Sequence, residues 1–308
     1  MQEGSRKAIV AAFFANLGIA IAKFVGFFLT SSAGLLAEAG HSLADTSNQA
    51  LLLLGGRRAS RVADEDHPFC YGRERYFLAF VVALVLFSMG GLFALYEGIQ
   101  KLIDPHETEN LAVAIGILIV AIGLETFSLR TAVREANHVK PTDMGWWEFI
   151  RTSKQPELPV VLLEDVGAEI GLFLALAGVS LAATTGDPRW DAVGSIAIGV
   201  LLIVIGIFLA IETRGLLLGE RAAATSEEAI RRAITSHPAV RNLIHLRTQH
   251  LGPDVLLVGA KIEFANEFDT PRLATEVNAV ETAIRAVEPM AKWIYLEPDL
   301  LRSAGGGT

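Results

Sequence analysis

The chain has 308 residues, of which 52% are hydrophobic and only 19% are charged, and its mean hydropathy of +0.43 exceeds that of a typical soluble protein. The net charge of −8 gives no electrostatic support for nucleic-acid binding. The single cysteine, Cys70, excludes an internal disulfide and a zinc site built from several cysteines. We therefore expect an integral membrane protein that lies in a lipid bilayer.

Residues 1–215 contain six apolar segments of the length, about 20 residues, that crosses the hydrocarbon core of a bilayer. These predicted spans lie at 8–30, 34–56, 76–102, 110–134, 159–184 and 190–213. The apolar stretch after Lys7 is longer than the apolar region of a signal peptide, so we expect no cleavable one. The pattern predicts an all-α, six-helix transmembrane domain over residues 1–215.

Lys23 lies toward the outer end of the first predicted span, so we expect its long side chain to extend to the membrane interface. The second span, "AEAGHSLADTSNQALLLLGG", contains Glu38, His41 and Asp45. Each ionisable group in a bilayer costs at least about 2.5–3.5 kcal/mol and so must be paired, hydrated or functional. Helical spacing places the three along one stripe, because residues three or four apart lie on the same face.

One imidazole with several carboxylate oxygens suits a borderline divalent cation, most of all Zn²⁺, with Fe²⁺, Co²⁺ or Mn²⁺ as alternatives. The structural alternative is a hydrogen-bonded pair of His41 and Asp45 that holds two helices together. A second acidic helix in the same bundle makes the structural alternative less favoured.

Basic residues gather in two of the loops between spans. The loop after the second span and the region between the fourth and fifth contain Arg57, Arg58, Arg61, Arg73, Arg75, Arg130, Arg134, Lys140, Arg151 and Lys154. Because basic loops stay on the cytoplasmic side, we expect both termini in the cytoplasm. The expected location is a prokaryotic inner or plasma membrane. Glu125, in the fourth span, is expected to be a hydrogen-bond partner within the bundle.

The fifth span contains a second acidic group in "LLEDVGAEIG", namely Glu164, Asp165 and Glu169. Asp165 and Glu169 are one helical turn apart, whereas Glu164 is rotated by about 100° from Asp165. Asp165 is therefore the expected partner of His41 and Asp45.

After Gly219 charges become frequent and the pattern predicts α-β-β-α-β. A helix begins at Thr225 or Ser226, the turn "LGPD" joins the strands "NLIHLRTQH" and "VLLVGAKIEF", and "KWIYLEP" is the last strand. Pro271 fits the start of the second helix, with Asp269 or Thr270 as its cap. We expect a cytoplasmic α/β ferredoxin-like domain over 216–308, with a disordered end.

These features together resemble the cation diffusion facilitator family of divalent-metal transporters, to which the SLC30 zinc transporters belong. The similarity includes the six spans, His-x-x-x-Asp in the second, the acidic motif in the fifth and the ferredoxin-like tail. The similar stretches are long and include "AEAGHSLADTSNQALLLLGGRRASR" and "DEDHPFCYGRERY". The subgroup with Glu-Asp in the fifth span, as in "VVLLEDVGAEIG", includes mitochondrial-type zinc transporters.

The resemblance implies a homodimer that exports Zn²⁺ or a related cation from the cytoplasm in exchange for protons, by alternating access. It implies a tetrahedral site formed by His41, Asp45 and Asp165. The family's fourth ligand falls on Val161, which has no donor atom. Glu164, favoured by the subgroup pattern, Glu169, favoured by helical geometry, and water remain open as replacements.

Two further family sites are altered in this sequence. In the loop after the second span, the three ligand positions fall on Asp64, His67 and Tyr71. Asp64 and His67 are candidate metal ligands, and the alternative is an acidic loop that attracts cations. In the tail, Ile244 and Lys261 occupy two ligand positions, so we expect the tail to serve dimerisation without binding metal. The tail histidines, His237, His245 and His250, are then ordinary surface or strand residues.

Two other functions, a membrane metalloenzyme and a channel, are alternatives to transport by a carrier. A membrane metalloenzyme uses similar ligands, but of the seven histidines only His41 lies in a predicted span, and no His-Glu-x-x-His motif occurs. A channel would give flux that does not saturate. We expect a carrier that is not an enzyme, that has no resident cofactor and for which the metal is the substrate.

Overall fold

The computed structural model describes residues 3–31, 33–105, 110–265 and 268–301. The chain forms two compact units, each with its own hydrophobic core. The first unit contains the chain up to Arg58 together with Arg75–Arg214, and the second contains Ala59–Glu74 and the chain from Gly215 onward. The expected disordered end, 302–308, lies outside the described residues.

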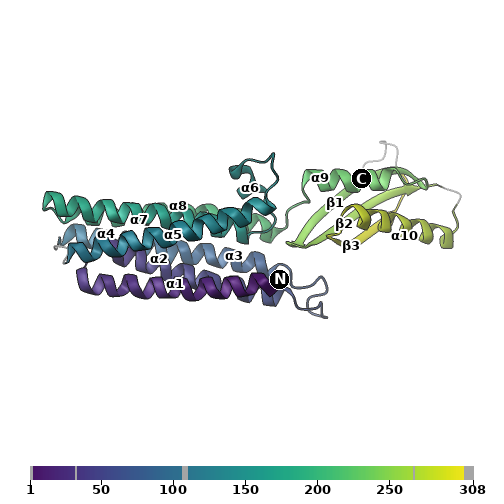
Figure 1. Ribbon diagram of the computed structural model, residues 1–308. Helices are drawn as coiled ribbons and strands as arrows, with labels where there is room; N and C mark the ends of the chain where they lie inside the picture. Colours follow the sequence, from purple (N-terminus) through teal and green to yellow (C-terminus); the bar gives the residue numbers. More distant parts are fainter. Residues whose placement is uncertain (1–2, 32, 106–109, 266–267, 302–308) are drawn as a thin grey trace. The chain divides into compact units, whose positions relative to one another are not determined.

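All six predicted spans are helices of the bundle (Figure 1). Five are single helices: α1 (Glu3–Thr30), α2 (Ala33–Ala59), α5 (Leu111–Val139), α7 (Glu157–Thr185) and α8 (Arg189–Leu218). The third predicted span is a continuous run of α3 (Glu74–Val85), the π-helical segment η1 (Leu86–Leu92) and α4 (Phe93–Ile103). A short helix that the sequence pattern did not predict, α6 (Trp146–Thr152), precedes α7.

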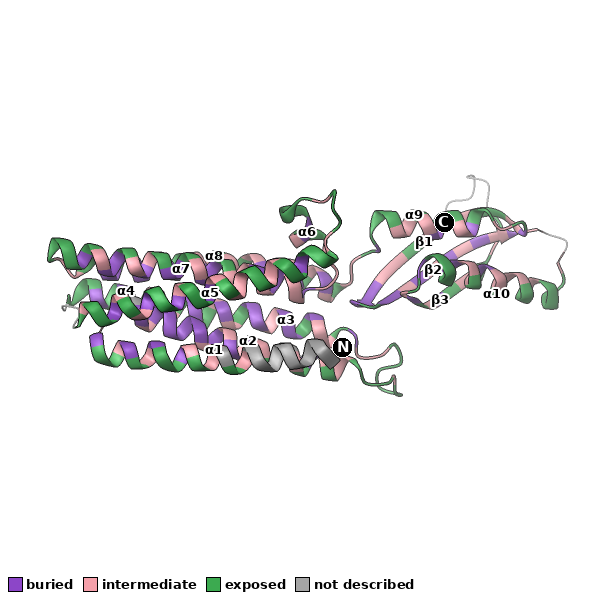
Figure 2. Cartoon of the chain, viewed as in Figure 1, coloured by how far each residue is buried: buried purple, intermediate pink, exposed green. Residues whose placement is uncertain are grey.

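Among the described residues, four helices are long and apolar enough to cross a membrane: Glu74–Ile103, Leu111–Val139, Glu157–Thr185 and Arg189–Leu218. Helix α1 has a shorter apolar part, Asn16–Thr30, and α2 contains the ionisable stripe. The outward helix faces are exposed (Figure 2), with apolar side chains such as Phe28 and Phe127 78% and 75% exposed. Large exposed apolar surfaces are typical of lipid contact.

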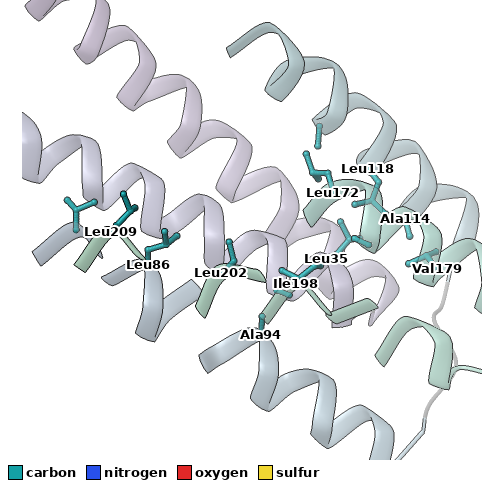
Figure 3. Close-up of a cluster of buried hydrophobic side chains, with 14 of the residues drawn as sticks. Leu35, Leu86, Ala94, Ala114, Leu118, Leu172, Val179, Ile198, Leu202 and Leu209 are labelled. Atoms are coloured by element: carbon teal, nitrogen blue, oxygen red, sulfur yellow. The ribbon is translucent and has the colours of Figure 1, made fainter. Parts of the chain in front are cut away.

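Leucine, isoleucine, valine and alanine side chains fill the interior between the helices (Figure 3). Leu118 of α5, Leu172 of α7 and Ile198 of α8 are fully buried. Helix α8 approaches the third span closely, because a Cβ atom at Gly199 would lie 2.6 Å from the backbone nitrogen of Leu95. A larger residue at 199 would therefore separate these helices.

The π-helical segment lies beside the ionisable stripe of α2. A Cβ atom at Gly90 of η1 would be 3.8 Å from Nδ1 of His41. Short π-helical insertions occur frequently at functional sites, and this one shifts the register of the third span next to the buried histidine.

The second unit has the predicted α-β-β-α-β order: α9 (Ala224–Thr235), β1 (Val240–Gly252), β2 (Val255–Phe264), α10 (Thr270–Val287) and β3 (Ala291–Pro298). The sheet order is β1-β2-β3, with β1 and β2 antiparallel and β2 and β3 parallel. Helices α9 and α10 contact each other and pack on the sheet through Ile230, Ile234, Val280 and Ile284. This is the ferredoxin-like arrangement expected from the sequence.

The loop Ala59–Glu74 belongs to the second unit, although the sequence pattern assigned it to the transmembrane domain. The ring of Phe69 contacts Trp293 of β3 edge-on, with 5.5 Å between centroids. A Cβ atom at Gly72 would lie 2.7 Å from the carbonyl oxygen of Leu251 at the end of β1. An aromatic contact and a close backbone approach, neither visible in local sequence, therefore fix the loop on the sheet.

Asp269 is the cap of α10, because its Oδ1 accepts a hydrogen bond from the backbone N–H of Arg272 at 2.9 Å. Asp269→Ala is expected to destabilise the first turn of α10 by about 1 kcal/mol, which corresponds to about fivefold faster amide exchange there. Hydrogen exchange of the full chain measures this change. Thr282→Ala on the same helix is the control and should leave the exchange of the first turn unchanged. Equal exchange in the wild type and the Asp269 variant would contradict the prediction.

Candidate functional site

His41 and Asp45 form a buried pair on α2. Nε2 of His41 lies 3.5 Å from Oδ2 of Asp45, and their side chains are 1% and 14% exposed. Neither ring nitrogen of His41 has a hydrogen-bond partner, and neither does Oδ1 of Asp45. A buried polar atom without a partner costs about 1–3 kcal/mol. Such atoms are rare in folded proteins and call for a functional explanation.

The acidic residues of α7 point in two directions. Oε1 of the buried Glu164 accepts a short hydrogen bond from Nδ2 of Asn48, which lies on α2 one turn after Asp45. Oδ2 of Asp165 accepts one from Ser128 of α5 at 3.3 Å. Glu164 is thus turned toward α2, whereas Asp165 contacts α5.

Glu169 is also directed at α5. Its Oε1 accepts a hydrogen bond from Thr126 Oγ1 at 2.7 Å, and its buried Oε2 has no partner. Asp165 and Glu169 share one face of α7, as helical spacing predicts. That face is turned toward a helix other than the one that holds His41.

Asp45 on α2 interacts electrostatically with two acidic residues of α7, Glu164 and Asp165. Within the described part of the chain, however, no set of three or more His, Cys, Asp or Glu side chains is already arranged to hold a metal ion. Val161, where the resemblance predicts a fourth ligand, has no donor atom. Coordination of one ion by both helices would therefore require movement of these side chains.

Asn48 is a candidate site residue that the sequence interpretation missed. It lies three residues after Asp45 and seven after His41, so the helical repeat already placed it on the same stripe. Its Oδ1 is buried without a hydrogen-bond partner, while its Nδ2 holds Glu164. A search for polar residues, not only ionisable ones, would have found it.

Lys23 does not extend to the membrane interface, so that expectation was wrong. Its side chain is 1% exposed, and its ammonium group lies 3.2 Å from Glu38 Oε2 and 3.9 Å from Glu125 Oε1. Glu125 was expected to be a hydrogen-bond partner within the bundle, and it lies there as a more distant ion-pair partner of Lys23, while Glu38 contacts Lys23 directly. Lys23 stays in the interior because its two acidic partners, Glu38 and Glu125, lie there on two other helices.

Asp64 and His67 form a self-contained network in the loop of the second unit. Asp64 accepts hydrogen bonds from the Tyr71 hydroxyl at 2.5 Å and from the His67 backbone N–H at 2.8 Å. These bonds, with Tyr71 first, lower the pKa of the Asp64 carboxyl, and the bond to Asp64 raises the pKa of Tyr71. Both Asp64 oxygens are therefore engaged, and metal binding by Asp64 and His67 stays a prediction that requires their release.

The tail histidines have ordinary positions in the second unit. His245 and His250 lie on β1, where His245 pairs with Lys261 across the ladder. Nε2 of His237 lies 4.0 Å from Oε2 of Glu276. Lys261 itself contacts Asp299 and Glu297, and these two hydrogen bonds raise its pKa. The Lys261 ammonium group therefore occupies a position at which the resemblance predicts a metal ligand in related proteins.

Comparisons with known proteins agree with this architecture. Residues 9–218 match the family model described as the cation efflux transmembrane domain. The chain is 29% identical over 263 residues to the Homo sapiens protein named proton-coupled zinc antiporter SLC30A9, mitochondrial, which covers 85% of this chain and 46% of that protein. It is 28% identical over 254 residues to the zinc transporter ZitB of Pectobacterium atrosepticum, covering 82% and 73% of the two chains.

A further relative is the cation-efflux pump FieF of Serratia proteamaculans, with 28% identity over 248 residues that cover 80% of this chain and 76% of the relative. The chain spans about half the length of the mitochondrial antiporters that it matches. The names of these relatives denote transport proteins and not enzymes. Since the family model covers more than half of the sequence, the chain belongs to the cation efflux family.

Proposed function

We propose that the chain exports a divalent cation, with Zn²⁺ as its principal substrate, from the cytoplasm in exchange for protons. His41, Asp45 and Asp165 are the proposed ligands, with Glu164 as the fourth. The observation that carries the proposal is the buried His41–Asp45 pair, whose ring nitrogens and Oδ1 have no hydrogen-bond partners. Oδ1 of Asp45 and one of the two ring nitrogens of His41 can each donate an electron pair to a metal ion, and Asp45 interacts electrostatically with Glu164 and Asp165 of α7.

The donor set supports Zn²⁺ over harder cations. One imidazole nitrogen with carboxylate oxygens suits Zn²⁺, whereas Mg²⁺ and Ca²⁺ prefer oxygen alone. Fe²⁺, Co²⁺ and Mn²⁺ remain alternative substrates, because geometry and availability also decide which metal a site binds. The relatives named as a zinc antiporter and a zinc transporter support the same choice.

Proton exchange follows from the chemistry of the ligands. Imidazole and carboxyl groups must lose their protons to coordinate a metal, so metal binding releases protons and metal release takes them up. The side chains of α2 and α7 are close without forming a closed site, which fits a site that opens to either side of the membrane in turn. A relative named as a proton-coupled antiporter supports this coupling.

The orientation and assembly are part of the same proposal. Basic loops after the second span and before the fifth favour cytoplasmic termini, so that export moves the ion away from the side of the soluble unit. We propose a homodimer in which this ferredoxin-like unit supplies the contact between protomers. The membrane is proposed to be a prokaryotic inner or plasma membrane.

Zinc accumulation in proteoliposomes tests the proposed exchange. With purified full-length protein and a zinc-sensitive dye inside the vesicles, a lumen one pH unit more acidic than the medium should drive Zn²⁺ uptake. Each exchanged proton adds about 1.4 kcal/mol, or about tenfold in the accumulation ratio. A protonophore should abolish this gain, and protein-free vesicles are the control.

The same assay separates the proposal from its alternatives. The rate of uptake should saturate as the Zn²⁺ concentration rises, because each cycle of a carrier occupies one site. Uptake that stays proportional to the Zn²⁺ concentration would indicate a channel. Saturable uptake that ignores the pH gradient would leave transport standing and exclude proton exchange.

A further inference from the structure

A second cluster of buried charges lies beside the candidate site and takes no part in the proposed coordination. The ammonium group of Lys23 in α1 is 2.8 Å from Ser42 Oγ and 3.2 Å from Glu38 Oε2 on α2, and 3.9 Å from Glu125 Oε1 on α5. We call Glu38, Ser42 and Glu125 the oxygen cluster. Lys23 and Glu38 are 1% and 0% exposed, so the ammonium group lies among these oxygens in the interior of the bundle.

Lys23 does not saturate the oxygen cluster. Oε1 of Glu38 is buried and has no hydrogen-bond partner. This oxygen lies against α7, where a Cβ atom at Gly171 would be 2.5 Å from it. A buried carboxylate oxygen without a partner is destabilising. The cluster therefore holds one cationic group and keeps an unused acceptor.

The chemistry of the oxygen cluster suits a hard cation. Mg²⁺ and Mn²⁺ prefer carboxylate and other oxygen ligands, and Mg²⁺ binds them at about 2.0–2.1 Å. The distances of 2.8 and 3.2 Å from the Lys23 nitrogen are instead those of hydrogen bonds or ion pairs to an ammonium group. For a divalent ion in the place of this nitrogen, the two carboxylates would have to close in by about 1–2 Å.

The oxygen cluster adjoins the proposed ligands. Ser42 follows His41 in the sequence, and Glu38 precedes it by one turn. Glu125 interacts electrostatically with both Asp45 and Asp165. A divalent ion that reached the candidate site would therefore come near two further carboxyl groups, which Lys23 engages.

We propose that Lys23 is a resident cation that determines specificity, because its ammonium group occupies the oxygen cluster and keeps divalent ions out of it. Without Lys23, Glu38, Ser42 and Glu125 form an oxygen-only site that favours Mn²⁺. With Lys23 in place, a metal ion that enters the bundle meets the site that contains the His41 imidazole. The contacts of Lys23 alone support its place in the oxygen cluster. Its effect on which metal is transported rests on the proposed function.

Mn²⁺ binding to the purified full-length protein tests this assignment. Electron paramagnetic resonance distinguishes free from bound Mn²⁺, so a titration counts the ions bound per chain. Lys23→Met is expected to bind about one more Mn²⁺ per chain than the wild type. Lys23→Arg keeps a cation in place and should bind no additional ion. Lys101→Met is the matched control, because Lys101 is also buried and its ammonium group lies 2.8 Å from the carboxyl group of Asp191.

Combined variants separate this inference from the proposed function. In a His41→Ala, Asp45→Ala background, Lys23→Met should still add one Mn²⁺, and further replacement of Glu38 and Glu125 by Gln should remove it. Unchanged Mn²⁺ stoichiometry on Lys23→Met overturns the inference, and so does an additional ion that survives both Gln replacements. If the proposed function is wrong, the His41→Ala, Asp45→Ala variant should instead bind Zn²⁺ as well as the wild type does.

A stability measurement covers the case in which Lys23→Met folds poorly. Lys23→Gln keeps a hydrogen-bond donor near Ser42 and Glu38 but removes the charge, and it should gain the same ion. A ligand that binds only the folded state raises Tm. Mn²⁺ should therefore raise the Tm of either variant more than that of the wild type, and equal shifts overturn the inference.

Discussion

Replacement of His41 by Ala, or of Asp45 by Asn, is expected to abolish Zn²⁺ transport in proteoliposomes. Both residues are proposed ligands, and even the outer partners of metal ligands contribute about 10–100-fold in affinity or activity. Loss of a ligand itself should therefore reduce the initial rate by about 100-fold or more. Isothermal titration of the same preparations should show a matching loss of Zn²⁺ affinity.

The stability of these variants separates a ligand role from a structural one. A histidine that holds two helices together would have partners for its ring nitrogens, but neither nitrogen of His41 has a hydrogen-bond partner. His41→Ala removes unsatisfied buried atoms, which offsets part of the cost of the cavity that it leaves. We therefore expect a small change in Tm together with the loss of transport.

Matched replacements elsewhere in the first unit serve as controls. His138 at the end of α5 and Asp143 in the following loop are both exposed, so His138→Ala and Asp143→Asn should transport Zn²⁺ at the wild-type rate. Wild-type transport by His41→Ala and Asp45→Asn would refute the ligand assignment. A large drop in Tm with normal transport per folded molecule would favour the structural role.

The helices and strands were predictable because their patterns are local. Apolar segments of membrane-spanning length mark the six spans, and alternation with turn residues marks β1 and β2. The pairing of His41 with Asp45 was equally accessible, since residues four apart on one helix must be neighbours. The sequence limited the cap of α10 to Asp269 or Thr270 beside Pro271, and the structure shows that it is Asp269. Each of these inferences needs only one element of structure.

Local sequence patterns did not predict the contacts between different helices. The directions of Glu164 and Asp165 depend on Asn48 of α2 and Ser128 of α5, which lie far away in the sequence. Lys23 near a helix end could extend to the interface or turn inward, and its acidic partners on two other helices decide the outcome. Nothing in local composition distinguishes the π-helical segment from the α-helix around it.

The choice between Glu164 and Glu169 as the fourth ligand is the second prediction with a large effect. Glu164→Gln is expected to lower Zn²⁺ affinity and transport by about 10–100-fold, because Asn48 already holds this carboxyl against the helix that bears His41 and Asp45. Glu169→Gln should change them by less than about threefold, because Thr126 holds Glu169 against α5. Isothermal titration and zinc uptake, compared on the same two variants, measure the difference.

Asn48→Ala provides an independent arm of this test. If Asn48 orients Glu164, its removal should weaken Zn²⁺ binding by about tenfold in the wild type and have little further effect in the Glu164→Gln background.

Glu169 also has a buried oxygen without a partner, so a reversed result is physically reasonable. A large loss with Glu169→Gln and none with Glu164→Gln would assign the fourth ligand to Glu169. Near-normal affinity in both variants would leave water as the fourth ligand, and the site would then keep an open coordination position that Val161, which has no donor atom, does not fill.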